Sequence, residues 1–134
     1  MKLQTATRLA LYAVMALSRE PERQFSTAEL AERFDVSEHH LAKVLRTLGR
    51  AELVEAVRGA GGGFRFSANP KRVTLLEVIA LFEDITSPPG PKEPGVRTHE
   101  GKALGAVLAE IDDVARATLG SITLATLHRS ATRR

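Results

Sequence analysis

The segment 26–66 constrains the fold more than any other part of the sequence, because two short helix signals are followed at once by a glycine-rich hairpin signal. Ser26 and Glu29 have the spacing of a capping box, which predicts that a helix begins there. After a tight turn, Ser37 is the candidate cap of another helix that runs to about Gly49. The segment therefore predicts two helices joined by a short turn, the helix-turn-helix arrangement.

Two short strands with a glycine turn between them are expected next. Residues 53–57 alternate enough to predict a strand, and the returning segment 64–66 alternates apolar and polar side chains. The turn 58–63 reads Arg-Gly-Ala-Gly-Gly-Gly, and Asn69 and Pro70 close the hairpin. We therefore expect a mainly α protein with a small β-hairpin wing, built as a winged helix-turn-helix with a long dimerisation helix.

Further helices are expected on both sides of this unit. The alanine-rich residues 3–18 predict an amphipathic first helix. Thr74 and Glu77 repeat the capping-box spacing and predict a fourth helix. The side chains that this helix is expected to bury are Val78, Ile79, Phe82 and Ile85.

The last part of the chain divides into a loop, a long helix and a tail. Four of the six prolines lie in residues 86–99, which predicts a loop or linker. A long helix is expected from about Glu100, with Thr123 capping a final short turn and 130–134 forming a frayed basic tail. The expected divisions are a winged helix-turn-helix domain at 1–85, the Pro/Gly-rich loop at 86–99, and the dimerisation helix with its tail at 100–134.

The long helix carries an apolar stripe that is broad for a winged unit already closed by four helices. One face can pack on the first helix while the rest meets a partner copy, so the stripe predicts a homodimer. The residues expected at the dimer interface are Leu104, Val107, Leu108, Ile111, Val114 and Leu119. A twofold dimer can place two equivalent helices about 34 Å apart, which is one turn of double-stranded DNA.

The helix that begins after Ser37 has one apolar face and one cationic face. Its inward positions repeat at helical spacing and are Leu41, Val44, Leu45 and Leu48. Its outward positions are His39, Lys43, Arg46 and Arg50, with His40 beside them. Such a helix can enter the major groove of DNA, where Ser37 can offer its hydroxyl or backbone N–H to a phosphate. The alternative is an ordinary solvated helix face.

The hairpin tip begins with Arg58, and an arginine on a protruding turn can reach the negative potential of a narrow minor groove. Gly59, Gly61 and Gly62 allow positive φ and a close approach to the sugar-phosphate chain. The alternative is a flexible tip with an incidental arginine. A nucleotide-phosphate loop is excluded, because a strand-like Phe-Arg-Phe rather than a helix follows the glycines.

Charge and hydropathy are in keeping with a DNA partner. The formal net charge is +3, of which residues 1–72 carry +4 and residues 73–134 carry −1, so the first half is the expected contact surface for an anion. No stretch approaches the roughly 20 apolar residues that span a bilayer, and the N-terminal segment is expected to be a helix rather than a signal peptide. We therefore expect a cytoplasmic protein with no membrane partner.

These motifs resemble those of the IscR/NsrR-type bacterial transcription regulators, the Rrf2 superfamily, over nearly the whole chain. The resemblance rests on residues 1–3 opening directly into the first helix, and on segments 48–64, 73–79 and 121–124. It implies a homodimer that binds operator DNA through the helix after Ser37 and the wing. Carried over by position, the groove-reading residues are Ser37, His39, His40 and Lys43, and the minor-groove arginine is Arg58.

The sequence departs from the family at its sensor. The best-known members hold an iron–sulfur cluster with three cysteines in the loop before the long helix, whereas this chain has no cysteine. Some members also use an acidic ligand near position 8, where this chain has Arg8. The resemblance therefore implies a cluster-free branch without a cofactor. An unidentified small-molecule effector stays open, and nothing in the sequence locates its pocket.

No pattern supports catalysis or a metal site. The four histidines lack metal-ligand spacing with another donor, and no Ser/His/Asp or paired-carboxylate arrangement is present. We expect a DNA-binding transcription regulator that acts as a repressor, not an enzyme. The alternative is a winged-helix module for protein interaction without sequence-specific DNA binding. Lys43, Arg46 and Arg58 favour DNA, because protein-docking wings do not need these cations.

Overall fold

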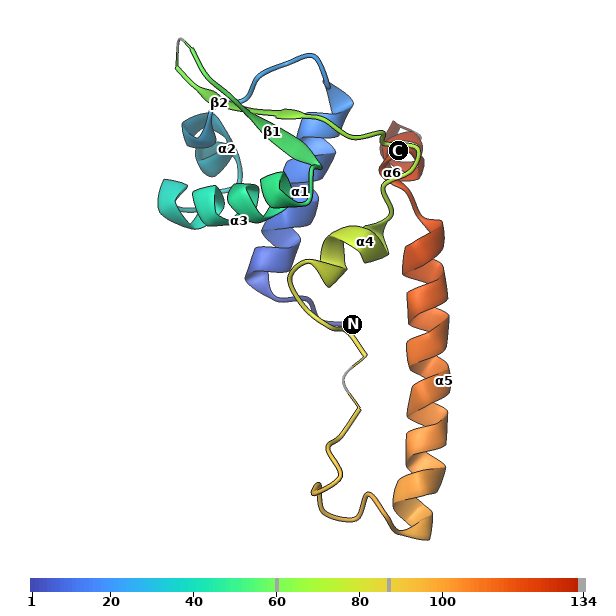
Figure 1. The fold of residues 1–134 in the computed structure, drawn as a ribbon. Coiled ribbons are helices and arrows are strands. Elements are labelled where there is room, and N and C mark those ends of the chain that lie inside the picture. The colour runs from blue at the N-terminus through green and yellow to red at the C-terminus, as the bar shows by residue number, and fades with distance from the viewer. Residues whose placement is uncertain (60, 87, 133–134) are drawn as a thin grey trace.

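The computed structural model describes residues 1–59, 61–86 and 88–132, and there it contains six helices and one two-stranded antiparallel sheet. The elements are α1 (Thr5–Arg19), α2 (Thr27–Arg33), α3 (Glu38–Arg50), β1 (Val54–Val57), β2 (Gly63–Phe66), α4 (Leu75–Ala80), α5 (His99–Ser121) and α6 (Leu124–Thr132). Figure 1 shows a body made of the other elements, from which α5 extends as an arm. The expected mainly α fold with a hairpin wing is confirmed.

Helix α1 is the centre of the body. Eight of its fifteen residues are buried, and it contacts α3, α4, α6 and β2. Ala10, Ala13, Val14 and Leu17 are completely buried. The small alanine side chains let neighbouring helices approach closely, while valine and leucine fill the remaining space. The amphipathic first helix predicted from the sequence is therefore present, and its apolar side chains form the core.

Helices α2 and α3 form the helix-turn-helix. The Ser26 hydroxyl accepts the backbone N–H of Glu29 at 3.1 Å, and the Glu29 carboxylate accepts the backbone N–H of Ser26 at 2.9 Å, which confirms the capping box. Ser37 caps α3 by accepting the backbone N–H of His40 at 3.1 Å. Between the helices, Asp35 has φ 53°, a left-handed conformation that aspartate tolerates better than most residues. This turn brings α3 into contact with α2.

The wing is a hairpin that a third segment ties to the body. β1 and β2 pair over four residues each, ending with Val57 opposite Gly63. Just before α2, Phe25 exchanges two backbone hydrogen bonds with Phe64, each 2.8 Å long. The Phe25 side chain is buried. The root of the wing is therefore anchored both by backbone pairing and by the core.

Helix α4 is shorter than the sequence predicts. Thr74 caps it as expected, by accepting the backbone N–H of Glu77 at 3.1 Å. The helix ends at Ala80, so the prediction that Phe82 and Ile85 extend its buried stripe is wrong; both lie beyond the helix and are half-buried.

The reason that the chain leaves α4 early is a contact with the start of α1. The carboxylate of Glu83 accepts the backbone N–H of Gln4 at 2.8 Å and the hydroxyl of Thr7 at 2.5 Å. Glu83 thereby supplies an acceptor to a helix that has no side-chain cap and no acidic residue in its own first turn. A continued α4 helix is a local preference, whereas this contact joins residues almost eighty positions apart.

The C-terminal segment is a helix where a frayed tail was expected. α6 continues to Thr132, so the expectation is wrong for residues 130–132, and residues 133–134 lie outside the described part of the chain. Thr123 caps α6 through the backbone N–H of Thr126 at 3.1 Å, as predicted, but the element that it caps is a nine-residue helix and not a short turn. The difference arises because α6 packs against α1, and this tertiary contact stabilises a segment with few local helix signals.

Helix α5 makes its contacts with the body through α4 and leaves the rest of its length outside. None of its 23 residues is buried. The segment between α4 and α5 runs alongside it (Figure 1), so the arm consists of one long helix and the loop that precedes it.

Gly63→Ala should destabilise the fold much more than Gly61→Ala. A Cβ on Gly63, which has φ 134°, would lie 2.9 Å from the carbonyl carbon of Phe25, where the paired backbones cannot separate freely. A Cβ on Gly61, which has φ 87°, would have no atom within 4 Å, so alanine there meets backbone strain alone. We expect losses of about 1 kcal/mol for Gly61→Ala and about 3 kcal/mol or more for Gly63→Ala in urea unfolding. Equal losses would contradict the close backbone contact at the wing root.

The stability of the protein should fall as the pH drops through the titration of His128. Burial, followed by the charge of Arg19, holds the pKa of His128 below its ordinary value, and its Nε2 lies 2.8 Å from the Ser18 hydroxyl oxygen. As the pH falls, the unfolded chain therefore binds this proton at a higher pH than the folded protein does. The free energy of unfolding should decrease as the pH falls from about 6.5 and level off below the lower pKa of the folded state.

Urea unfolding at a series of pH values measures this effect. His128→Gln should flatten the pH dependence, whereas the same substitution at His99, which is exposed at the start of α5, is the control. An identical pH profile for His128→Gln and the wild type would show that His128, which is half-buried, does not contribute.

Candidate DNA-binding surface

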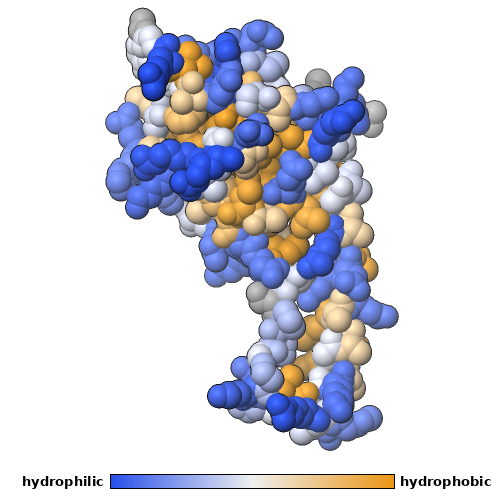
Figure 2. All heavy atoms as spheres, viewed as in Figure 1, coloured by the Kyte–Doolittle hydropathy of each residue, from blue (hydrophilic) through white to orange (hydrophobic). Residues whose placement is uncertain are grey.

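Helix α3 has the two faces that the sequence predicts. Its buried side chains are Leu41, Val44, Leu45 and Leu48. On the other face His39, Lys43, Arg46 and Arg50 are exposed, and His40 is half-buried. Figure 2 shows hydrophilic residues gathered over α3, with apolar residues beside them toward the centre of the body. The cations of this helix therefore share one open surface.

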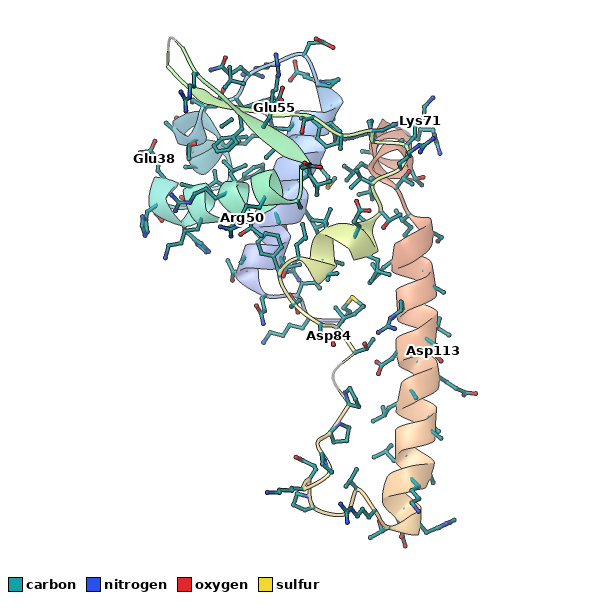
Figure 3. The ribbon with its side chains drawn as sticks, viewed as in Figure 1. Glu38, Arg50, Glu55, Lys71, Asp84 and Asp113 are labelled. Atoms are coloured by element: carbon teal, nitrogen blue, oxygen red, sulfur yellow. The ribbon has the colours of Figure 1, made fainter. Side chains whose placement is uncertain are left out.

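The N-terminus of α3 is open at the same surface. The Ser37 oxygen accepts a hydrogen bond from within its own helix, so its hydroxyl hydrogen is the part that can still be donated to a phosphate. Glu38 comes next in the chain, is exposed, and lies at the free end of α3, with Arg50 at the other end (Figure 3). Glu38 is not among the predicted residues, because the prediction is based on cationic side chains. A carboxylate can nevertheless accept a hydrogen bond from the amino group of cytosine.

The wing tip places Arg58 directly after β1, where it is exposed. Gly59, Gly61 and Gly62 all have positive φ, as the tip was expected to require, while Ala60 lies outside the described residues. Together these residues form a narrow protrusion with one cation at its base, next to the α2–α3 unit (Figure 1).

An open groove of about 790 Å³ separates α3 from the wing. Arg46 and Arg50 line it from α3, and Glu52 and Glu55 line it from the chain that leads into β1 and from β1 itself. Glu55 is paired across the strands with Arg65 at 2.5 Å, and both side chains are about half exposed. An exposed pair of this kind adds little to stability. It does offset one of the negative charges beside the two arginines.

The segment before α2 supports the wing, and sequence reasoning missed it. The Gln24 side chain donates a hydrogen bond to the carbonyl oxygen of Gly62. The Arg23 guanidinium lies 4.2 Å from the ring centre of Phe25 and pairs with Glu29 at 2.8 Å. No local pattern signals the bond from Gln24, since Gln24 and Gly62 are 38 residues apart. This bond ties the tip of the wing to the segment before α2.

The arm exposes a row of large apolar side chains. Five of the six predicted dimer residues are between 48% and 66% exposed, namely Leu104, Val107, Leu108, Ile111 and Val114. The sixth, Leu119, is half-buried. Contiguous apolar surface of this kind on a water-exposed helix marks an interaction site. We call these five residues the arm stripe.

The described residues offer no group of three or more His, Asp or Glu side chains placed to hold a metal ion. An iron–sulfur cluster of the usual kind is held by cysteine thiolates. The chain contains no cysteine, so the residues present do not fit such a cluster. None of the described helices is both long and apolar enough to cross a bilayer.

The fold and this surface define a class, the winged helix-turn-helix transcription regulators. The family model Rrf2, described as an iron-dependent transcriptional regulator, matches residues 3–130, and the chain belongs to this family. The resemblance that the motifs indicated is therefore confirmed, in a member without cysteine.

Relatives identified by sequence carry regulator names. The chain is 50% identical over 128 residues to the HTH-type transcriptional regulator BadM of Rhodopseudomonas palustris, an alignment that covers 95% of this chain and 81% of that protein. It is 35% identical over 85 residues to the HTH-type transcriptional regulator NsrR of Bacillus subtilis, covering 63% and 58% respectively. The chain is accordingly a transcriptional regulator and not an enzyme.

Solved structures confirm the winged-helix fold. CymR of B. subtilis, described as the global cysteine regulator, superposes with a TM-score of 0.79 at 26% identity and covers 95% of each chain. IscR of T. potens superposes with a TM-score of 0.78 at 25% identity, covering 98% of this chain and 88% of that one.

Proposed function

We propose that the protein is a homodimeric, sequence-specific DNA-binding repressor of the cytoplasm. In this proposal α3 enters the major groove of operator DNA, and Arg58 of the wing enters the minor groove. No iron–sulfur cluster or other cofactor takes part. The single observation that carries the proposal is the division of α3 into a buried leucine face and an open cationic face beside the wing.

The cationic face is arranged for groove binding. The residues proposed to reach base edges lie at the cap and in the first two turns of α3, and they are Ser37, His39, His40 and Lys43. Farther along the helix, Arg46 and Arg50 line the groove beside the wing and are placed for phosphates. Gly59, Gly61 and Gly62 keep the tip narrow beside Arg58.

The arm stripe supports the dimer. Its large apolar side chains form a contiguous exposed patch, which is unusual for a surface that stays in contact with water. In a twofold dimer, the same stripe on a second copy can cover this patch. A twofold pair of winged units suits DNA, because two α3 helices can then meet successive major grooves. Repression is the simplest regulatory outcome, because a dimer bound at a promoter blocks access to that DNA without contacting another protein.

The second candidate function is a winged-helix module that binds another protein and no specific DNA. The exposed apolar arm favours it, because the same surface can receive a foreign helix. The cations at Lys43, Arg46 and Arg58 oppose it, because a protein-docking wing has no need for them.

Lys43→Ala and Arg58→Ala should each weaken binding to a duplex selected from random sequence. If Lys43 reads a base, its loss should cost about 1–3 kcal/mol of binding free energy. If it touches only phosphate, the loss of affinity should be uniform across sequences and the salt dependence should be shallower. Losing Arg58 should also reduce the preference for A/T-rich flanks. Fluorescence anisotropy at several salt concentrations measures both effects.

Lys71→Ala is the matched control for these variants, because Lys71 is an exposed cation near α6 and away from α3 (Figure 3). Wild-type affinity for Arg58→Ala would refute the wing assignment. The absence of salt-dependent binding to any duplex by the wild type would refute the DNA-binding proposal and favour the protein-interaction function.

Ile111→Glu should convert the dimer to a folded monomer. Ile111 is 58% exposed, so the substitution places a charge in the proposed interface without disturbing the core. Sedimentation should show the monomer, and affinity for a two-half-site duplex should fall more than about tenfold. Ala117→Glu is the control, since Ala117 is exposed about 120° around the same helix. A monomeric wild type would contradict the dimer.

A further inference from the structure

A cavity of about 770 Å³ lies in the arm, between the loop after α4 and the N-terminal half of α5. Figure 1 shows this loop running beside the lower part of the long helix. The apolar lining of the cavity comes from Ile85, Pro88, Pro89, Pro94, Val96, Leu104, Leu108 and Ala109. The volume falls in the range of about 300–1,000 Å³ that is usual for small-molecule sites.

The loop is fastened to α5 at both ends. Near its start, Arg116 of α5 donates a hydrogen bond to the Thr86 hydroxyl, and Asp84 accepts the backbone N–H of Thr86 at 2.9 Å. Near its end, the Thr98 hydroxyl donates to the Gly95 carbonyl oxygen at 2.6 Å and accepts the backbone N–H of Gly101 at 3.0 Å. The cavity is the space that remains between these two attachments.

Two glycines of α5 have opposite roles beneath the loop. A Cβ on Gly101 would lie 2.9 Å from the Val96 Cα, so the missing side chain lets the loop backbone touch the helix there. A Cβ on Gly105 would have no atom within 4 Å, although this residue lines the cavity. One turn beyond the contact, the helix therefore leaves space open where an ordinary side chain would fill it.

The charges around the cavity are mainly negative. Glu93, Glu100 and Asp112 line it, against the single cation Lys102. Asp112 is half-buried, and within the described part of the chain its carboxylate has no hydrogen-bond or ion-pair partner. A carboxylate held at an apolar surface without a partner favours a cationic ligand and disfavours an anionic one.

We propose that this cavity is a binding site for a small molecule with an apolar body and a protonated amine, with Asp112 as its counter-ion. Binding of this molecule does not depend on the proposed function. Only its role as the signal that controls the regulator rests on that function. Leu104 and Leu108 belong both to the cavity wall and to the arm stripe, so the bound molecule lies next to the proposed dimer interface.

The test uses two probes with the same apolar body and opposite charge, 1-aminoadamantane and adamantane-1-carboxylate. Each is titrated into the full chain without DNA, and the amide signals of Gly101 and Gly105 are followed by NMR. The amine should shift these signals saturably, and the carboxylate should bind at least about tenfold more weakly. Asp112→Asn should weaken the amine about fivefold. Asp113→Asn, the next residue on the same helix (Figure 3) and not part of the lining, should not.

A second pair of variants tests the space itself. Gly105→Leu should abolish the shift of the Gly101 amide by filling the cavity, whereas Gly105→Ala should keep most of the binding and serves as the baseline for helix propensity. Ala106→Leu places the same leucine side chain on an exposed neighbour outside the lining and should leave binding unchanged.

The outcomes separate the two proposals. Equal binding of both probes, no shift with either, or unchanged binding in Asp112→Asn or Gly105→Leu would overturn the site. Saturable, Asp112-dependent binding of the amine by a protein that binds no duplex would establish the site while refuting the DNA-binding function.

Discussion

The packing of α1 against α3, α4, α6 and β2 is the interaction on which the rest of the structure depends. Its alanines permit close contact on several sides, and Val14 and Leu17 fill the space between the neighbours. Helix α3 also contacts α2 and β1, but α4 has only six residues of its own and α4 and α6 both pack on α1. The position of α3, and of the point where α5 leaves the body, is therefore set by one common support.

Helix α3 packs on the body through its buried face, which carries three leucines and a valine. The opposite face of α3 is therefore not part of the core. Burying each of those leucines contributes about 1.5–3 kcal/mol. The cations opposite them are exposed and make no buried contact. Their presence is thus not explained by stability, and a row of cations on one open helix face has a ready explanation in an anionic partner. The helix can be altered on that face with little effect on the fold.

The sequence is informative where the physical cause is local. Helical periodicity and caps act within about four residues, so the two faces of α3 and the caps at Ser26 and Ser37 are predictable. The early end of α4 and the support of the wing by Gln24 and Phe25 depend on partners tens of residues away. Propensity and pattern contain no information about such partners.

The same distinction explains the C-terminus and the candidate site. α6 is a helix because α1 lies against it, which no tail composition can indicate. The exposed cationic face of α3 is predictable from helical periodicity, because its spacing is set within the helix. The cavity in the arm is not, because it results from how a proline-rich loop is fastened to a distant helix.

The loop of the arm is shaped by hydrogen bonds, in a chain that has no cysteine to hold a cluster there. The hydrogen bonds that Thr86 donates to Asp84 lower the pKa of that carboxyl group below its ordinary value. α5 thereby presents two adjacent faces, one lined by small residues under the loop and one by the large side chains of the arm stripe. Leu104 and Leu108 lie on the border between them. Because these two leucines belong both to the cavity wall and to the arm stripe, the loop lies directly against part of the proposed dimer interface, away from the packing around α1.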